Sequence, residues 1–190
     1  IQRAFKHVAL DDMALLAITG ENQIGRLRYT QPGAQQKGRK AEVGLAELLK
    51  TGSEAGLFEH LVDTYLESGI SGFQPKVMIP DADKSEPVTI VTGNGVDEKT
   101  TATTPSLILK AAGDDYPHLA VNEYLCMSAA RRAGIQVPPF WLSEDQSLFV
   151  MERFDVEEGV QLGFEDMAVL MGKNHTEPNF KYSSSYENIA

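Results

Sequence analysis

The sequence predicts an α+β fold in which a small antiparallel sheet is crossed by one helix. Four short apolar stretches have the length and composition of strands, namely KVMIP, PVTIVTG, SLILKAA and SLFVMERF. One long amphipathic stretch, YPHLAVNEYLCMSAARRAGIQVPP, separates the third strand from the fourth and predicts a helix. A further short helix is expected in GFEDMAVLMG, after the last strand. We expect the crossing helix to stop at Gly134, ahead of Pro138 and Pro139.

The composition limits which functions are open to the chain. With 190 residues, 42% of them hydrophobic, it can bury the core of one domain, or of one domain and a piece of another. Its net charge of −10 argues against general binding to nucleic-acid backbones, so no direct nucleic-acid partner is expected. No apolar run approaches the roughly 20 residues of a membrane helix, so no membrane partner is expected either.

Cysteine and histidine usage indicates a reducing compartment and no metal site. Cys126 is the one cysteine, which excludes an internal disulfide and a cysteine zinc site and indicates the cytoplasm. The histidines are scattered without the spacing of metal ligands, at His7, His60, His118 and His175. We therefore expect no metal bound by these residues.

The N-terminal part of the chain divides into two predicted helices and a linker. The chain starts at Ile1, without a methionine or a signal-peptide layout, and we expect it to be a fragment. LDDMALLAITG predicts a short helix capped by Gly20, with a strand following at Leu27–Tyr29. The polar stretch TQPGAQQKGRKA places a domain boundary within residues 31–56. GLFEHLVDTYLESG then predicts a helix that ends at Gly69 and has an apolar face of Leu57, Leu61, Tyr65 and Leu66.

The stretch GNGVDEKT, residues 93–100, is one residue away from a phosphate-binding P-loop pattern. Glu98 replaces the second required glycine and Asp97 precedes it, so two carboxylates would face the phosphates. We interpret Asn94 and Gly95 as a turn or loop instead.

A more specific set of residues is spread along the chain. The turn SGISGFQPK joins the second predicted helix to KVMIP, and glycine-freed amides with a lysine close behind suit a phosphate. Lys110 ends the apolar strand SLILK, and Glu123 lies in the crossing helix. The stripe Leu119, Glu123, Cys126 and Ala130 turns Glu123 toward the sheet.

A carboxylate that faces the sheet is unfavourable unless it is paired. Two arrangements stay open, because Glu123 either pairs with Lys110 or lies at the edge of the stripe and reaches water. A Gly-rich turn, a strand lysine, a helix glutamate and a strand ending in VMERFD follow the order of parts in a protein-kinase N-lobe.

Several ordered stretches resemble the HipA family of bacterial serine/threonine kinases, the toxins of type II toxin–antitoxin pairs. Within residues 65–172 they are ISGFQPKVMI, SLILKAAGDDYPHLAVNEYLCMSAARRAGIQVPPFWL, LFVMERFD and LGFEDMAVLMG, and NFKYSSSYENIA follows. ALLAITGENQIGRLRY looks like the end of the small N-terminal subdomain of this family. The resemblance implies the end of that subdomain in residues 1–40 and a connector in residues 41–56. It implies a kinase-like N-lobe, a hinge and the first helix of the C-lobe in residues 57–190.

The same resemblance implies ATP as the cofactor, together with Mg²⁺. Lys110 would contact the α- and β-phosphates and pair with Glu123. Glu152, Arg153 and Phe154 would form the cofactor-binding segment after the last strand, in which Glu152 and Phe154 would hold adenine through backbone groups. The loop over the phosphates would consist of Ser71, Gly72, Phe73, Gln74, Pro75 and Lys76.

Relatives of this kind are shut off by autophosphorylation of a serine in or just before that loop. Ser71 is the first candidate and Ser68 the second, because the commonest modified position of the family falls on Gly69. A phosphoryl group there would add roughly −1.5 to −2 charge where a phosphate of ATP should lie, and should therefore repel ATP.

The catalytic aspartate and the metal ligands of the family are expected beyond residue 190, so no catalytic residue is assigned and this chain alone should phosphorylate nothing. The implied partners are a protein substrate, in relatives an aminoacyl-tRNA synthetase, and an antitoxin with a DNA-binding domain, in the bacterial cytoplasm. One alternative is a non-catalytic ATP-binding or protein-interaction module with a kinase-like lobe. Another is an unrelated α+β domain whose Gly-rich turn is only a turn.

Overall fold

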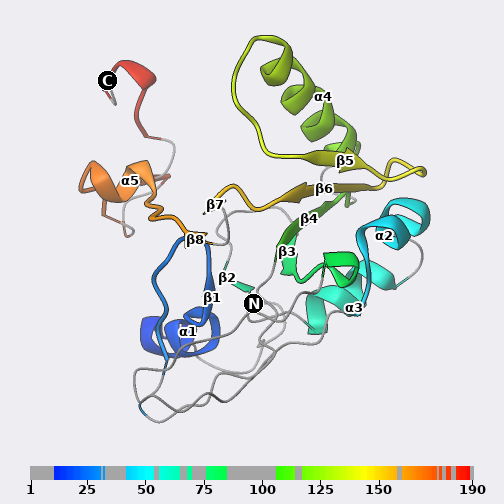
Figure 1. Ribbon diagram of the computed structural model, residues 1–190. Coiled ribbons are helices and arrows are strands. Elements are labelled where there is room, and N and C mark those ends of the chain that lie inside the picture. Colours follow the sequence, from blue (N-terminus) through cyan, green and yellow to red (C-terminus); the bar gives the residue numbers. More distant parts are fainter. Residues whose placement is uncertain are drawn as a thin grey trace. The chain divides into compact units, whose positions relative to one another are not determined.

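The chain divides into two compact units, one formed by residues 1–23 and 28–154 and the other by residues 24–27 and 155–190. The computed structural model (Figure 1) describes residues 11–30, 32, 42–53, 56–64, 68–69, 76–84, 106–113, 117–157, 160–174, 176, 179–180 and 183–188.

An antiparallel sheet of four strands forms the centre of the first unit, with the strand order β3-β4-β6-β5. Its strands are β3 (Lys76–Ile79), β4 (Leu107–Ala111), β5 (Phe140–Leu142) and β6 (Leu148–Glu152). The mixed α+β class is confirmed, as are the strands expected in KVMIP, SLILKAA and SLFVMERF. The predicted strand at 87–93 and the turn at 93–100 lie outside the described residues.

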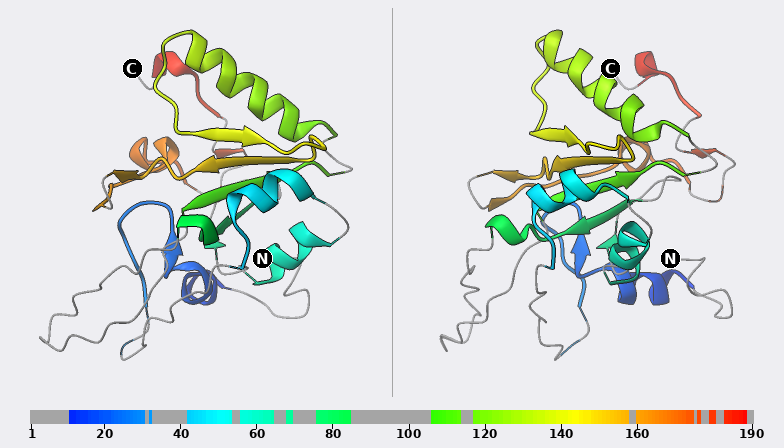
Figure 2. Two further views of the ribbon diagram at one scale, coloured as in Figure 1. Left: turned by 45° about the vertical axis from the view of Figure 1, so that its right-hand side comes forward. Right: turned by 90° about the vertical axis from the view of Figure 1, so that its right-hand side faces the viewer.

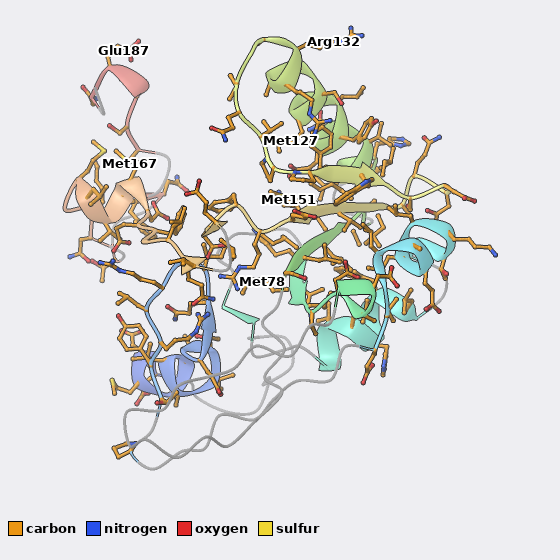
Figure 3. All side chains as sticks on the ribbon, viewed as in Figure 1. Met78, Met127, Arg132, Met151, Met167 and Glu187 are labelled. Atoms are coloured by element: carbon orange, nitrogen blue, oxygen red, sulfur yellow. The ribbon has the colours of Figure 1, made fainter. Side chains whose placement is uncertain are left out.

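Both faces of this sheet are covered, which explains why β4 and β6 are apolar almost throughout. Successive side chains of a strand point to opposite faces. One face forms the main core, with Val77, Ile79, Leu107, Leu109, Ala111, Leu148 and Val150. The other face carries a buried row in cross-strand register, which consists of Met78, Ile108, Met151 and Phe140. Figure 3 marks Met78 and Met151 on the sheet and Met127 on the helix α4 (Leu119–Arg132).

Helix α4 crosses the sheet on the side of this row and packs against β4, β5 and β6 (Figure 2). It ends as predicted, because Gly134 takes a left-handed backbone with φ of 84°. The Gly134 amide donates to the Arg131 carbonyl and the Ile135 amide to the Ala130 carbonyl, at 3.1 and 3.0 Å. This is the hydrogen-bond pattern of a Schellman motif, and it satisfies carbonyls left open at the helix end.

The predicted inward stripe of α4 is wrong at one position, since Cys126 is exposed. The less exposed stripe runs through Ala120, Glu123, Met127 and Ala130. Its spacing of three, four and three residues is as regular for a helix as the predicted one. Because Cys126 is apolar, the predicted stripe included it in place of Met127, the next residue along the helix.

Two helices cover the main core on the opposite side of the sheet from α4 (Figure 2). They are α2 (Leu45–Thr51) and α3 (Leu57–Thr64). Leu48, Phe58 and Leu61 bring their buried side chains into this core. Sequence reasoning missed α2, which lies in the predicted connector.

The N-terminus of α2 is capped by residues that are distant in sequence. Gly44 occupies its N-cap and offers no side chain. The amides of Leu45 and Ala46 donate instead to carboxylate oxygens of Asp81 and Asp83, each at 3.1 Å. A Cβ at Gly44 would meet the Asp83 carboxylate, so glycine is required for this approach. Asp83 lies in a 3-10 turn, η1 (Ala82–Lys84).

Helix α1 (Asp12–Thr19) begins at Asp11, whose carboxylate accepts a hydrogen bond from the Ala14 amide at 2.8 Å. It ends at Gly20 as predicted, although Gly20 has a right-handed backbone. Glycine is needed there for space, because a Cβ would lie 2.5 Å from the Leu16 carbonyl oxygen.

Two predictions about strand and helix ends near α1 and α3 are wrong. Leu27–Tyr29 form no strand; β1 (Asn22–Gln23) pairs instead, in parallel, with β2 (Ser68–Gly69). Helix α3 accordingly ends at Thr64 and not at Gly69. The pairing joins segments far apart in sequence, and no local pattern indicates it.

The second unit holds a small hairpin and a short helix. The strands β7 (Val156–Glu157) and β8 (Val160–Gln161) pair antiparallel. Helix α5 (Met167–Leu170) lies within the predicted segment, and a 3-10 turn, η3 (Tyr186–Asn188), follows. The buried Asp155 carboxylate accepts a hydrogen bond from the Gly25 amide at 2.6 Å, which ties residues 24–27 to this unit. Within the described part of the chain, no helix is long and apolar enough to cross a membrane.

Candidate functional site

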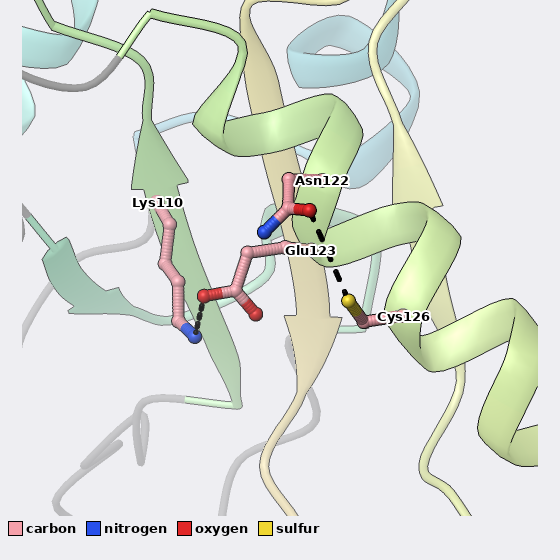
Figure 4. A network of polar contacts seen from close by, with 4 residues as sticks. All are labelled: Lys110, Asn122, Glu123 and Cys126. Atoms are coloured by element: carbon pink, nitrogen blue, oxygen red, sulfur yellow. Dashed lines mark hydrogen bonds and ion pairs between the residues drawn. The ribbon is translucent and has the colours of Figure 1, made fainter.

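Lys110 and Glu123 form an ion pair between β4 and α4. The Lys110 Nζ lies 2.8 Å from the Glu123 Oε1, and Figure 4 shows the two side chains pointing toward each other. Their side chains are 19% and 23% exposed. Of the two arrangements that the sequence leaves open, the structure has the paired one. Glu123 keeps some contact with water.

The position of Lys110 on the sheet explains why it meets the helix. Lys110 belongs to the face that α4 covers, with Lys76 opposite on β3 and Phe149 opposite on β6. Side chains opposite each other in an antiparallel pair lie on the same face about 5 Å apart at their Cβ atoms. On this face Lys110 therefore lies between another lysine and a phenylalanine, and its ammonium lies 5.9 Å from the Phe149 ring centroid.

The Lys110 ammonium is the group of this arrangement that can take an anion. Lys76 is opposite Lys110 on the neighbouring strand, and the Glu123 carboxylate lies against the Lys110 ammonium. A half-buried ion pair is weak evidence for stability, since desolvation offsets much of its attraction. What the arrangement can do chemically is hold an ammonium group at a fixed point of the sheet, where it would attract phosphate oxygens.

The other predicted contacts with a nucleotide lie at the end of β6. Glu152 is opposite Leu107, three residues along β4 from Lys110. At about 3.4 Å per residue, this places the end of β6 roughly 10 Å along the sheet from the lysine. The Glu152 amide donates to the Pro139 carbonyl at 2.9 Å, and Phe154 is 43% exposed.

Arg153, the third residue predicted for this segment, lies between these two residues, and its cofactor-binding role stays a prediction. Its side chain is buried, and a guanidinium nitrogen donates to the Gln23 carbonyl at 3.1 Å. The Arg153 amide donates to the Ser106 carbonyl at 2.9 Å. The segment after β6 is thereby held to β1 and to the start of β4.

The predicted phosphate-covering loop is described only at its end. Residues 71–75 lie outside the described residues, whereas Lys76 begins β3. Ser68, the second candidate for autophosphorylation, lies in β2, and Ser71 lies outside the described residues. The nucleotide and phosphorylation roles of these residues stay predictions.

The described residues fit the phosphates of a nucleotide better than its metal ion. The ammonium of Lys110 can take a phosphate oxygen. Among the described residues, no group of three or more histidine, cysteine, aspartate or glutamate side chains could hold a metal ion. The exposed Cys126 thiol is 4.0 Å from the Asn122 side-chain oxygen, one turn from Glu123 (Figure 4).

Sequence reasoning missed a cluster of rings beside the ion pair. Phe149 and Phe140 lie with centroids 6.0 Å apart, and Tyr124 meets Phe140 edge-on at 5.4 Å. The Arg131 guanidinium lies 4.1 Å from the Phe140 centroid. Strand alternation could have placed Phe149 on the same face as Lys110 once the strand register was known.

A comparison with protein families finds one family whose model covers most of this architecture. The family model described as the HipA-like C-terminal domain matches residues 68–190, which is more than half of the chain. No curated protein matches the chain. The matched region contains the sheet, α4, the ion pair and the second unit except for residues 24–27, and the chain belongs to the HipA family.

Proposed function

We propose that the sheet and α4 form the N-lobe of a HipA-type serine/threonine kinase and bind ATP. The observation that carries this proposal is the Lys110–Glu123 ion pair at 2.8 Å, between a central strand and the helix that follows it. Protein kinases use such a strand-lysine and helix-glutamate pair to hold the phosphates of ATP. Membership of the HipA family supports the assignment independently of this distance.

The layout of the sheet supports a direction for the bound nucleotide. Lys110 would contact the α- and β-phosphates, with the predicted loop of residues 71–76 above them. The backbone of Glu152 and Phe154 would hold adenine at the end of β6. An extended nucleotide could span the roughly 10 Å between these two places.

Autophosphorylation of Ser71, with Ser68 as the second candidate, would switch this site off. A phosphoserine carries about −1.5 to −2 charge, which would compete with ATP for the same cations. Glycines in the loop would allow it to lie over the phosphates or to swing outward. The proposed targets of the active enzyme are serine or threonine hydroxyls of a protein substrate, and an antitoxin is the proposed binding partner.

Autophosphorylation of the complete protein tests the proposal. Lys110→Ala should lower its rate by roughly 10²- to 10³-fold, the usual loss when one preorganised electrostatic contact to developing charge is removed. Lys50→Ala is the matched control, because Lys50 is an exposed lysine in the last turn of α2. Phosphate incorporation is measured by mass spectrometry, and thermal unfolding checks that both variants fold.

The location of the switch is tested with Ser71→Ala and Ser68→Ala. Ser71→Ala should incorporate no inhibitory phosphate and should keep its ATP affinity after incubation with ATP. If it gains phosphate at the normal stoichiometry and loses ATP affinity, the switch lies elsewhere. A protein that binds ATP but transfers no phosphoryl group would support the non-catalytic module instead.

A further inference from the structure

The Lys110 ammonium has an aromatic neighbour in addition to Glu123. The ring centroid of Phe149 is 5.9 Å from the Lys110 Nζ, within the roughly 6 Å over which a ring attracts a cation. Phe149 is the β6 residue directly opposite Lys110, so the two side chains share one face of the sheet. Phe149 has no exposed surface, and the packing around it holds its ring in place.

Phe149 also contacts a ring that touches α4. Its neighbour Phe140, with the centroids 6.0 Å apart, lies on β5. Tyr124 meets the Phe140 ring edge-on at 5.4 Å, and the Arg131 guanidinium lies 4.1 Å from its centroid. Both Tyr124 and Arg131 belong to α4.

Helix α4 therefore reaches Lys110 by two routes. The direct route is the carboxylate of Glu123. The indirect route begins at Tyr124, the next residue along the helix, and passes through Phe140 and Phe149 to the ammonium. A shift of α4 on the sheet would disturb both routes together.

From these contacts we propose that Phe149 is a positioning residue for Lys110. Its ring holds the ammonium beside Glu123, and its contact with Phe140 makes this geometry depend on where α4 lies. The proposal rests on the nucleotide role proposed for Lys110 and adds the residue that orients it. A leucine at this position would fill much of the same space but would lack the negative ring face that attracts a cation.

Phe149→Leu and Phe149→Met in the complete protein remove the ring, and Val150→Ala is the control. Val150 is the next residue of β6, is equally buried, and belongs to the main core on the opposite face. Its truncation weakens packing without touching Lys110. Thermal unfolding is measured first, and if Phe149→Leu does not fold, Phe149→Met decides the outcome.

The first readout is acylation of Lys110 without nucleotide, quantified by mass spectrometry against the exposed Lys50 in the same molecule. The ring attracts the charged ammonium, so its loss should raise the rate of acylation at Lys110, relative to that at Lys50, roughly two- to five-fold. This is the range expected for the loss of one cation–π contact. Val150→Ala should leave the ratio at the wild-type value. An unchanged ratio in the Phe149 variants, or an equal rise in Val150→Ala, would overturn the proposal.

The second readout is phosphoryl transfer by the same variants. A misplaced ammonium should lower kcat several-fold and change the KM for ATP less, because its charge acts most strongly in the transition state. A fall in kcat for the Phe149 variants no larger than that for Val150→Ala would contradict positioning. If the wild-type protein binds no ATP, the proposed function fails, while the acylation ratio still decides whether Phe149 orients Lys110.

Discussion

A half-buried ion pair such as Lys110–Glu123 adds little to the free energy of unfolding, because desolvation offsets most of the Coulomb attraction. Glu123→Gln keeps the size of the side chain and removes its charge. We expect it to change the free energy of unfolding by less than about 1 kcal/mol, and to lower autophosphorylation by at least about tenfold through misplacement of Lys110.

Glu47→Gln is the matched control for that substitution, since Glu47 is an exposed glutamate in the first turn of α2. Chemical denaturation gives the stability of both variants, and phosphate incorporation gives their activity. Equal activity of Glu123→Gln and Glu47→Gln would remove the ion pair from the mechanism.

Asp145 is a residue whose charge stabilises a turn rather than a site. Burial alone would raise the pKa of Asp145, but hydrogen bonds from Ser143 and Ser147 outweigh it and hold the pKa below its ordinary value. A lowered pKa in the folded state means that this contribution is complete above the ordinary aspartate pKa and is lost as the pH falls through the lowered one. Gly52 leaves room for this carboxylate, which a Cβ there would meet.

We therefore expect Asp145→Asn to be less stable than the wild type at neutral pH, with the difference shrinking in the acid range. Thermal unfolding midpoints measured from neutral pH down to about pH 3 check this expectation. A stability difference that does not depend on pH would show that the Asp145 charge is not what stabilises the turn.

At the scale of elements, the end of α4 depends on a backbone that favours glycine. Gly134 has φ of 84° and no neighbouring atom within 4 Å of a would-be Cβ, so Gly134→Ala introduces backbone strain without a clash. We expect it to lower the free energy of unfolding by about 1 kcal/mol. Gly113→Ala is the control, because its site is equally open and its φ is not in the left-handed region. Equal stability of the two variants would contradict this account of the helix end.

The elements that the sequence predicts correctly are those with a strong local pattern. The strands that carry Lys110 and Phe149 are apolar almost throughout, and α4 combines a helical period with a stop at Gly134. Helix α2 was missed because its first turn is capped by Asp81 and Asp83, far away in sequence, and not by a neighbour. Strand β5 is three residues long and becomes recognisable only through its pairing with β6.

The same distinction holds for the candidate site. The pairing of Lys110 with Glu123 could be predicted because helical spacing turns the glutamate toward a strand that carries a lysine. The Phe149 and Phe140 rings could not, because their contact depends on the register of β5 against β6. Local pattern indicates which side chains face a layer, and the strand register decides which of them meet.

For the whole molecule, membership of the HipA family and the α+β fold are the findings that support the proposed nucleotide-binding lobe. The predicted boundaries at residues 40 and 56 stay predictions. The four-stranded sheet has a core on one face and the ion pair on the other, under α4. A substitution at Lys110 should therefore affect ligand binding far more than folding.

Calorimetric titration of the complete protein with ATP tests this central claim most directly. The wild-type protein and Lys50→Ala should bind ATP with equal affinity. Lys110→Ala should bind it roughly 10- to 100-fold more weakly, as expected for the loss of one charge-assisted contact, while it still unfolds in one cooperative thermal transition. Wild-type affinity for ATP in Lys110→Ala would contradict the claim that this lysine holds the nucleotide.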